Sequence, residues 1–245
     1  MILNTSSTGE FRLLKLKNLV AKYRTCYATK KLLKFLAEPN YYFIENDWGE
    51  LKDDRTATVR VNRNLVDKRS IVAKRYNRKD TWHAVRRTIR RSRGENCWIQ
   101  AINLEKLEIG IAPPVAFIQE YVWPGIKGGS WYLYEFVDGL SFIEKLQDVD
   151  RSASEKVMEE IVATLTALWK QHISHGDTKG TNFLLVKDRV VIIDLDAMTQ
   201  HRNYESARRL IDKDVARFLR NWQDNPYLFE LAQTKLRRSG FILKQ

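Results

Sequence analysis

Alternating and helical patterns of hydrophobic residues divide this chain into a strand-rich first half and a helix-rich second half. Strand-like sequence occurs at 56–61, 70–76, 115–118 and 131–136, and a polar turn at 64–68 joins the first two segments into a predicted hairpin. After residue 152 the apolar residues recur at spacings of three and four, which is typical of amphipathic helices. This order predicts an α+β protein.

Proline, glycine and helix-capping residues set the other predicted boundaries. A very basic helical pattern at 81–108 ends before Pro113, and the glycine-containing loop at 123–129 has the composition of a mobile connection. Ser152 and Glu155 fit a capping box at the start of the next helix. The remaining predicted elements are short strands at 183–186 and 190–193 and a last helix at 210–222.

The first forty residues are strongly basic. Eight Lys or Arg residues and no acidic residue lie between Arg12 and Lys34, and apolar residues recur there at helical spacing. We predict a basic amphipathic helix, which either contacts a membrane surface or packs on its own domain with a solvated polar face. The predicted domains are an extension at 1–40, a β-rich lobe at 41–136 and a helical lobe at 137–245.

Composition restricts the class of protein and its partners. The 245 residues are 44% hydrophobic and include 7 Trp, 10 Tyr and 10 Phe, which argues against a disordered chain. A net charge of +12 and a pI of about 9.7 indicate an anionic partner: nucleic acid, an anionic membrane face or a phosphorylated substrate. Two cysteines without metal-ligand spacing, and no signal peptide or apolar run long enough to span a bilayer, lead us to expect a cytoplasmic protein.

Candidate chemistry is concentrated in the segment His-Gly-Asp-Thr-Lys-Gly-Thr-Asn-Phe at 175–183. Asp177 lies in a loop between a helix and a short strand, where its carboxylate can accept or orient the proton of an attacking hydroxyl. Lys179 can lie beside it and face a γ-phosphate. Asn182 and Asp194 offer oxygen ligands, which Mg²⁺ prefers. This order and spacing predict phosphoryl transfer from ATP.

Other residues are candidates for binding the nucleotide. Lys74 ends an apolar strand about a hundred residues before Asp177, the place where a kinase-like fold holds the α- and β-phosphates. Its acidic partner is left open among Glu95, which we favour, and Glu105, with Gln100 on the same predicted helix. We also assign Glu135 and Phe136, at the end of a predicted strand, to nucleotide binding.

These motifs, with Lys-Asp-Val-Ala-Arg at 213–217, resemble the bacterial lipopolysaccharide core kinases that phosphorylate heptose or Kdo. That family is related to protein kinases and to RIO and aminoglycoside kinases, and the resemblance covers roughly residues 50–222. It implies a bilobal protein-kinase-like fold, ATP and Mg²⁺ as cofactors, and an Asp214 that accepts backbone N–H groups of the catalytic loop. The chain departs from protein kinases at 49–56, where one glycine stands in place of a glycine-rich loop.

The resemblance implies a kinase that phosphorylates a sugar hydroxyl of the lipopolysaccharide inner core. Its substrate would be the core glycolipid, met at the cytoplasmic face of the inner membrane, where an anionic surface attracts basic residues. Nucleic acid is the less favoured partner. Two alternatives stay open: a RIO-like protein serine kinase, and a catalytically silent kinase fold that serves as a binding module.

Overall fold

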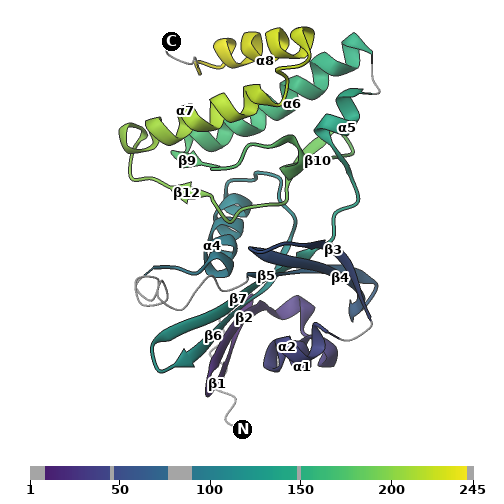
Figure 1. Ribbon diagram of the computed structural model, residues 1–245, viewed down its shortest axis with the longest axis vertical. Helices are drawn as coiled ribbons and strands as arrows, with labels where there is room; N and C mark the ends of the chain where they lie inside the picture. Colours follow the sequence, from purple (N-terminus) through teal and green to yellow (C-terminus); the bar gives the residue numbers. More distant parts are fainter. Residues whose placement is uncertain (1–8, 45–46, 77–89, 148–149, 242–245) are drawn as a thin grey trace. The chain divides into compact units, whose positions relative to one another are not determined.

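The computed structural model describes residues 9–44, 47–76, 90–147 and 150–241 (Figure 1). The chain divides into two compact units. The first unit contains residues up to 99 and residues 113–136, and the second contains residues 100–112 and all residues from 137 onward. Of the basic helical stretch predicted at 81–108, residues 81–89 lie outside the described residues, and α4 (Arg93–Lys106) forms within the remainder.

A seven-stranded antiparallel sheet forms the first unit, with the strand order β1-β2-β6-β7-β5-β4-β3. The predicted hairpin of β4 and β5 is confirmed, with Val61 opposite Val72 and a tight turn at Asp67 and Lys68. The strands are β1 (Phe11–Leu16), β2 (Leu19–Arg24), β3 (Trp48–Asp53), β4 (Ala57–Val66), β5 (Arg69–Tyr76), β6 (Pro114–Trp123) and β7 (Ile126–Glu135).

The N-terminal segment is a hairpin, so the helix predicted over 12–34 is wrong through residue 24. Strands β1 and β2 pair across a two-residue turn, and β2 continues the sheet by pairing with β6. Leu19, Ala21 and Tyr23 are buried on one face, which is the period-2 pattern of a strand. Over short stretches, the same apolar residues can fit both the helical period and the strand period. Pairing with β6 decided that this segment forms strands.

Two helices, α1 (Lys30–Ala37) and α2 (Pro39–Tyr42), belong to the same unit. The side chain of Thr29 accepts a hydrogen bond from the N–H of Leu32 and caps α1, and its hydroxyl donates to the carbonyl of Leu65 at 2.8 Å. Phe35 is fully buried and meets the Trp131 ring edge-on at 5.9 Å between centroids. Burial of these aromatic rings fixes α1 against the sheet.

The connection at 123–129 is part of a hairpin with register shifts between Gln119 and Trp123, which corrects the prediction of a mobile loop. Strands β6 and β7 continue through it to a register of Trp123 opposite Ile126. Gly125, in the turn between them, has a φ of +81°, a conformation that L side chains rarely adopt. The glycine therefore serves the tight turn.

The second unit contains three long helices that run alongside one another (Figure 1). It also contains a three-stranded sheet in the order β11-β10-β8 and a two-stranded sheet of β12 and β9. The N-cap of α6 is Asp150, which accepts from the N–H of Ala153, so the capping box predicted at Ser152 and Glu155 is wrong. The strands predicted near 183–193 are confirmed as a hairpin. The elements are α5 (Phe142–Gln147), α6 (Arg151–Lys170), α7 (Tyr204–Arg220), α8 (Pro226–Arg238), β8 (Leu140–Ser141), β9 (Ile173–Ser174), β10 (Phe183–Val186), β11 (Arg189–Ile192) and β12 (Thr199–Gln200).

Helix α4 (Arg93–Lys106) begins in the first unit and ends in the second. Its first half packs beneath the sheet, where the Tyr76 hydroxyl lies 3.0 Å from the Cys97 sulfur. In the described part of the chain, no helix is both long and apolar enough to cross a membrane.

Candidate active site

The segment 175–182 is a loop between β9 and β10. The hairpin of β10 with β11 brings the residues after β11 back beside this loop. The N–H of Ile193 donates to the carbonyl of Asn182 at 3.1 Å. This bond places Asp194 on the segment next to Asn182. Asn182 and Asp194, twelve positions apart in the sequence, are therefore neighbours because a four-residue strand pairs with the strand that follows it.

Asp214 on α7 anchors the start of this loop. Its carboxylate accepts from the backbone N–H of His175 at 2.6 Å, from that of Gly176 at 2.8 Å and from the Trp169 indole at 3.3 Å. Only 2% of Asp214 is exposed, and this burial raises its pKa even though the three donors favour the carboxylate. The predicted role of Asp214 as acceptor for the loop is confirmed.

Two further residues of α7 hold the rest of the loop. Arg217 donates through Nε to Oδ1 of Asp177 at 2.6 Å, and both side chains are 33% exposed. Asn221, which caps the C-terminus of α7, accepts from the N–H of Gly180 at 3.1 Å and donates to the carbonyl of Thr178 at 2.9 Å. These contacts bind successive loop residues to one helix.

Asp214, Arg217 and Asn221 share one face of α7 because they stand at positions i, i+3 and i+7. Sequence reasoning included Arg217 only as part of a motif and missed Asn221. A polar stripe within a helix that is otherwise apolar on that side was the available signal, because Val215, Phe218 and Leu219 are buried beside it.

His175 is a buried, neutral member of the loop. Its Nδ1 accepts from the N–H of Asp177 at 3.2 Å, and its ring packs against Phe183 at 5.0 Å between centroids. Burial lowers its pKa to about 4, although the nearby carboxylates of Asp194 and Asp177 act in the opposite direction. The Nε2 atom finds no partner among the residues that the structure describes.

The side chains of Asp177 and Lys179 remain open for chemistry. Arg217 engages Oδ1 of Asp177, and Oδ2 makes no hydrogen bond within the described ranges. Lys179 is exposed, and its carbonyl accepts from the N–H of Asn182 at 3.0 Å. One fixed and one open carboxylate oxygen suit a group that orients an attacking hydroxyl.

Asn182 and Asp194 present the oxygen donors that Mg²⁺ prefers. The Asn182 amide nitrogen donates to the carbonyl of Asp177 at 2.9 Å, which fixes the amide and leaves Oδ1 as the ligand atom. One oxygen of Asp194 accepts from the N–H of Asp196 at 3.3 Å. Across the described ranges, His, Cys, Asp and Glu side chains nowhere gather in threes as a metal site. An amide with one carboxylate fits an ion that also takes phosphate oxygens.

The first unit carries the predicted nucleotide-binding residues. Lys74 lies on β5, is 8% exposed, and has its Nζ 5.3 Å from the centroid of the Tyr76 ring. Glu95, in the first turn of α4, accepts from Nζ of Lys127 at 3.1 Å. This ion pair gives Glu95 a lysine other than the one predicted for it, and the acidic partner of Lys74 stays a prediction.

Glu135 and Phe136 lie at the end of β7 and just beyond it. The Glu135 carboxylate accepts from the Tyr27 hydroxyl at 2.7 Å and forms an ion pair with Arg69, and burial together with this bond raises the pKa of Tyr27. The N–H of Phe136 donates to the carbonyl of Ser70 at 2.7 Å, while its ring is exposed. A nucleotide role for either residue stays a prediction.

The turn between β3 and β4 contains the carboxylate of Asp54, which accepts backbone hydrogen bonds of the turn. Oδ1 of Asp54 accepts from the N–H of Thr56 at 2.6 Å and from that of Ala57 at 2.9 Å. Hydrogen bonds from Lys52 and then Thr56 lower the pKa of this carboxyl. Backbone N–H groups that a glycine-rich loop would offer to phosphate are thus occupied by a side chain.

Comparisons with known proteins agree with this geometry. Residues 132–228, which include Asp177, Asn182, Asp194 and Asp214, match the RIO domain, a member of the protein-kinase-like superfamily. Among solved structures, the chain is similar to WaaP in complex with acyl carrier protein, at 16% identity and a TM-score of 0.54, over 82% of this chain and 90% of that one. No curated protein sequence matches. The predicted α+β protein-kinase-like fold is confirmed.

Proposed function

We propose that this protein is an ATP-dependent kinase that phosphorylates a sugar hydroxyl of the lipopolysaccharide inner core. The observation that carries the proposal is the catalytic loop itself, in which Asp214 fixes the backbone before Asp177 and Arg217 fixes the Asp177 carboxylate. The sequence resemblance to lipopolysaccharide core kinases and the fold similarity to WaaP support it.

The loop residues have separate roles in this proposal. Oδ2 of Asp177 receives or orients the proton of the acceptor hydroxyl, and Lys179 lies against the transferred phosphate. Asn182 and Asp194 would hold Mg²⁺, which supplies charge neutralisation at the phosphates. Lys74 holds the remaining phosphates of ATP, because the backbone of the β3–β4 turn is engaged with Asp54.

The proposed acceptor also fits the charge of the chain. A net charge of +12 attracts an anionic glycolipid and the anionic bilayer face that carries it. We therefore propose that the protein acts at the cytoplasmic face of the inner membrane.

A protein serine kinase of the RIO type is the second candidate. It is favoured by the match of residues 132–228 to the RIO domain. The same loop would then act on a serine hydroxyl, since phosphoryl transfer asks mainly for positioning and charge neutralisation.

Transfer of labelled phosphate from ATP separates these candidates. The purified protein is incubated with core glycolipid from cells that lack core phosphate, and with a protein acceptor in a parallel reaction. We expect label on the glycolipid, lost in Asp177→Asn and retained in Asp188→Asn, the same change in an exposed turn. Label on protein alone would instead support the RIO-type kinase, and ATP binding without transfer would support a silent module.

A further inference from the structure

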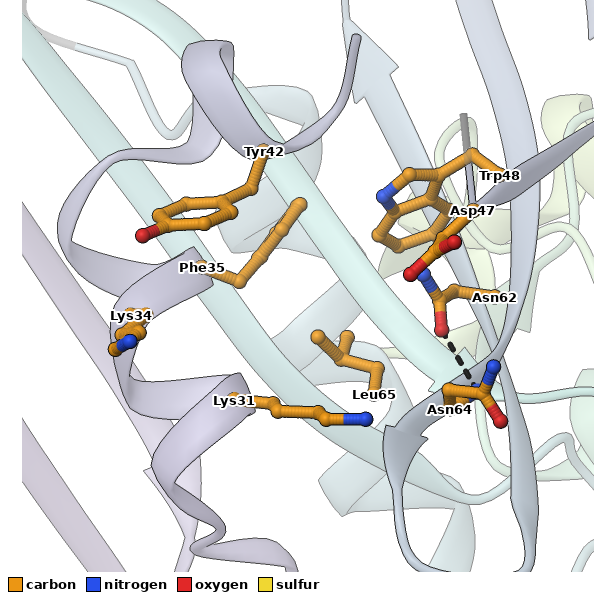
Figure 2. Close-up of a pocket in the computed structure, with 9 residues that line it drawn as sticks. All are labelled: Lys31, Lys34, Phe35, Tyr42, Asp47, Trp48, Asn62, Asn64 and Leu65. Atoms are coloured by element: carbon orange, nitrogen blue, oxygen red, sulfur yellow. Dashed lines mark hydrogen bonds between the residues drawn. The ribbon is translucent and has the colours of Figure 1, made fainter. Parts of the chain in front are cut away.

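A cavity of about 200 Å³ lies in the first unit, between helices α1 and α2 and the strands β3 and β4 (Figure 2). It is smaller than the roughly 300–1,000 Å³ of a pocket for a drug-sized ligand, and larger than the roughly 150 Å³ cavity that holds one benzene. Its size suits a single substituted six-membered ring. None of the residues assigned to phosphoryl transfer lines it.

One wall of the cavity is a supported indole. The Trp48 ring packs on Phe35 at 5.3 Å and on Phe43 at 5.4 Å between centroids, and is itself partly exposed. In Figure 2 its ring lies next to the side chain of Asp47. Because two buried rings hold it, the indole offers a flat apolar surface at little cost in side-chain entropy.

A buried amide with unused donors also lines the cavity. Asn62 is only 5% exposed, and its Oδ1 accepts from the N–H of Asn64 at 2.8 Å. This bond orients the amide, and the nitrogen is drawn beside Asp47 in Figure 2. The nitrogen donates no hydrogen bond within the described ranges, and Asn62 lines the cavity. A ligand oxygen would satisfy it.

Two lysines supply positive charge at the mouth. Lys31 and Lys34 on α1 line the cavity, are exposed, and form no ion pair with any described residue. In Figure 2 Lys31 extends toward Asn64. The opposite side carries one carboxylate, Asp47, which can accept hydrogen bonds from hydroxyl groups.

The frame of the cavity is fixed before any ligand arrives. Thr29 ties the start of α1 to β4 through its bond to Leu65 at 2.8 Å. Arg60 of β4 donates to the carbonyl of Phe43 at 2.7 Å and stacks over that ring, which ties the end of α2 to the same strand. Preorganised walls reduce the entropy lost on binding.

We propose that this cavity binds one anionic monosaccharide unit, a sugar ring that carries a phosphate or a carboxylate. The ring lies on Trp48, its hydroxyls bond to Asn62 and Asp47, and its anionic group meets Lys31, while Lys34 adds positive charge at the mouth. The proposal rests on the first unit alone, so it stands or falls independently of the kinase acceptor.

Calorimetric titration of the full chain with four probes tests the site: glucose 6-phosphate, glucuronate, glucose and inorganic phosphate. We expect one of the two anionic sugars to bind with a Kd of about 1 mM or tighter, at least tenfold better than glucose or phosphate. The sugar that binds identifies phosphate or carboxylate as the anion. The proposal would be overturned if neither anionic sugar bound up to about 10 mM, or if inorganic phosphate bound as tightly as the anionic sugars.

Variants of exposed lysines then locate the binding. Lys31→Ala combined with Lys34→Ala is expected to weaken the anionic sugar roughly tenfold to a hundredfold, by loss of charge-assisted hydrogen bonds. Lys30→Ala is the matched control, because Lys30 is exposed on the same helix and does not line the cavity. Unchanged binding by the double variant would place the ligand elsewhere and refute the assignment.

Discussion

Removing the Asp214 carboxylate should destabilise the protein more than almost any other polar substitution. Asp214→Ala leaves the N–H groups of His175 and Gly176 and the indole of Trp169 without their acceptor at a site that is 2% exposed. An unsatisfied buried donor costs about 1–3 kcal/mol. Relief of the buried charge, whose pKa is raised, offsets part of this loss. We therefore expect a net loss of about 3–6 kcal/mol, out of the roughly 5–15 kcal/mol typical of a domain.

Urea unfolding followed by circular dichroism measures this loss. Asp214→Asn keeps one acceptor oxygen and should lose about half as much, roughly 2–3 kcal/mol. Asp212→Ala is the control on the same helix, because Asp212 has no hydrogen-bond partner within the described ranges, and it should change stability by at most about 0.5 kcal/mol. A loss below about 1 kcal/mol for Asp214→Ala, or one equal to the control, would refute the reasoning.

Three further predictions concern the same loop. Burial lowers the pKa of His175 from 6.5 to about 4, so the neutral ring contributes stability that is present above pH 6.5 and lost as the pH falls toward 4. The total loss is about 3 kcal/mol. His175→Gln should flatten this pH dependence in urea midpoints measured between pH 7 and 5. Arg217→Ala should lower kcat roughly tenfold to a hundredfold with little change in the KM for ATP, because Arg217 orients Asp177. Arg217→Lys should recover part of the lost kcat. A change in the KM for ATP alone, equal in both variants, would contradict this prediction. Gly180→Ala should destabilise by about 1–3 kcal/mol, because its Cβ would overlap Ile143, and adding Ile143→Ala should restore part of the loss in thermal unfolding.

The N-terminal hairpin shows where sequence patterns were insufficient. Residues 11–24 contain apolar positions compatible with both a helix and a strand, and the spacing of three and four between some of them favoured the helical interpretation. The structure makes them β1 and β2 because β6 offers an edge with which β2 pairs. Pairing with a strand a hundred residues away carries no local signal. The β4–β5 and β10–β11 hairpins were predictable because both partners are adjacent in sequence.

The candidate site divides in the same way. Its proposed reactive groups, Asp177, Asn182 and Asp194, followed from residue type and spacing, since candidate oxygen ligands and a candidate carboxylate base are recognisable before folding. The supports of those groups did not, apart from Asp214. Arg217 pairs with a residue forty positions earlier, and a polar residue on a helix gives no indication of the loop it will meet.

The sequence by itself determined which side chains offer the chemistry that the proposed phosphoryl transfer needs, because side-chain chemistry is a property of each residue. Only the tertiary structure decided which of those atoms are held and which stay open. Helix α7 occupies one carboxylate oxygen of Asp177 with Arg217 and leaves the other, and β4 and α1 together enclose the cavity beside Trp48. Such pairings depend on packing between segments distant along the chain, and that packing is set by burial of the whole core.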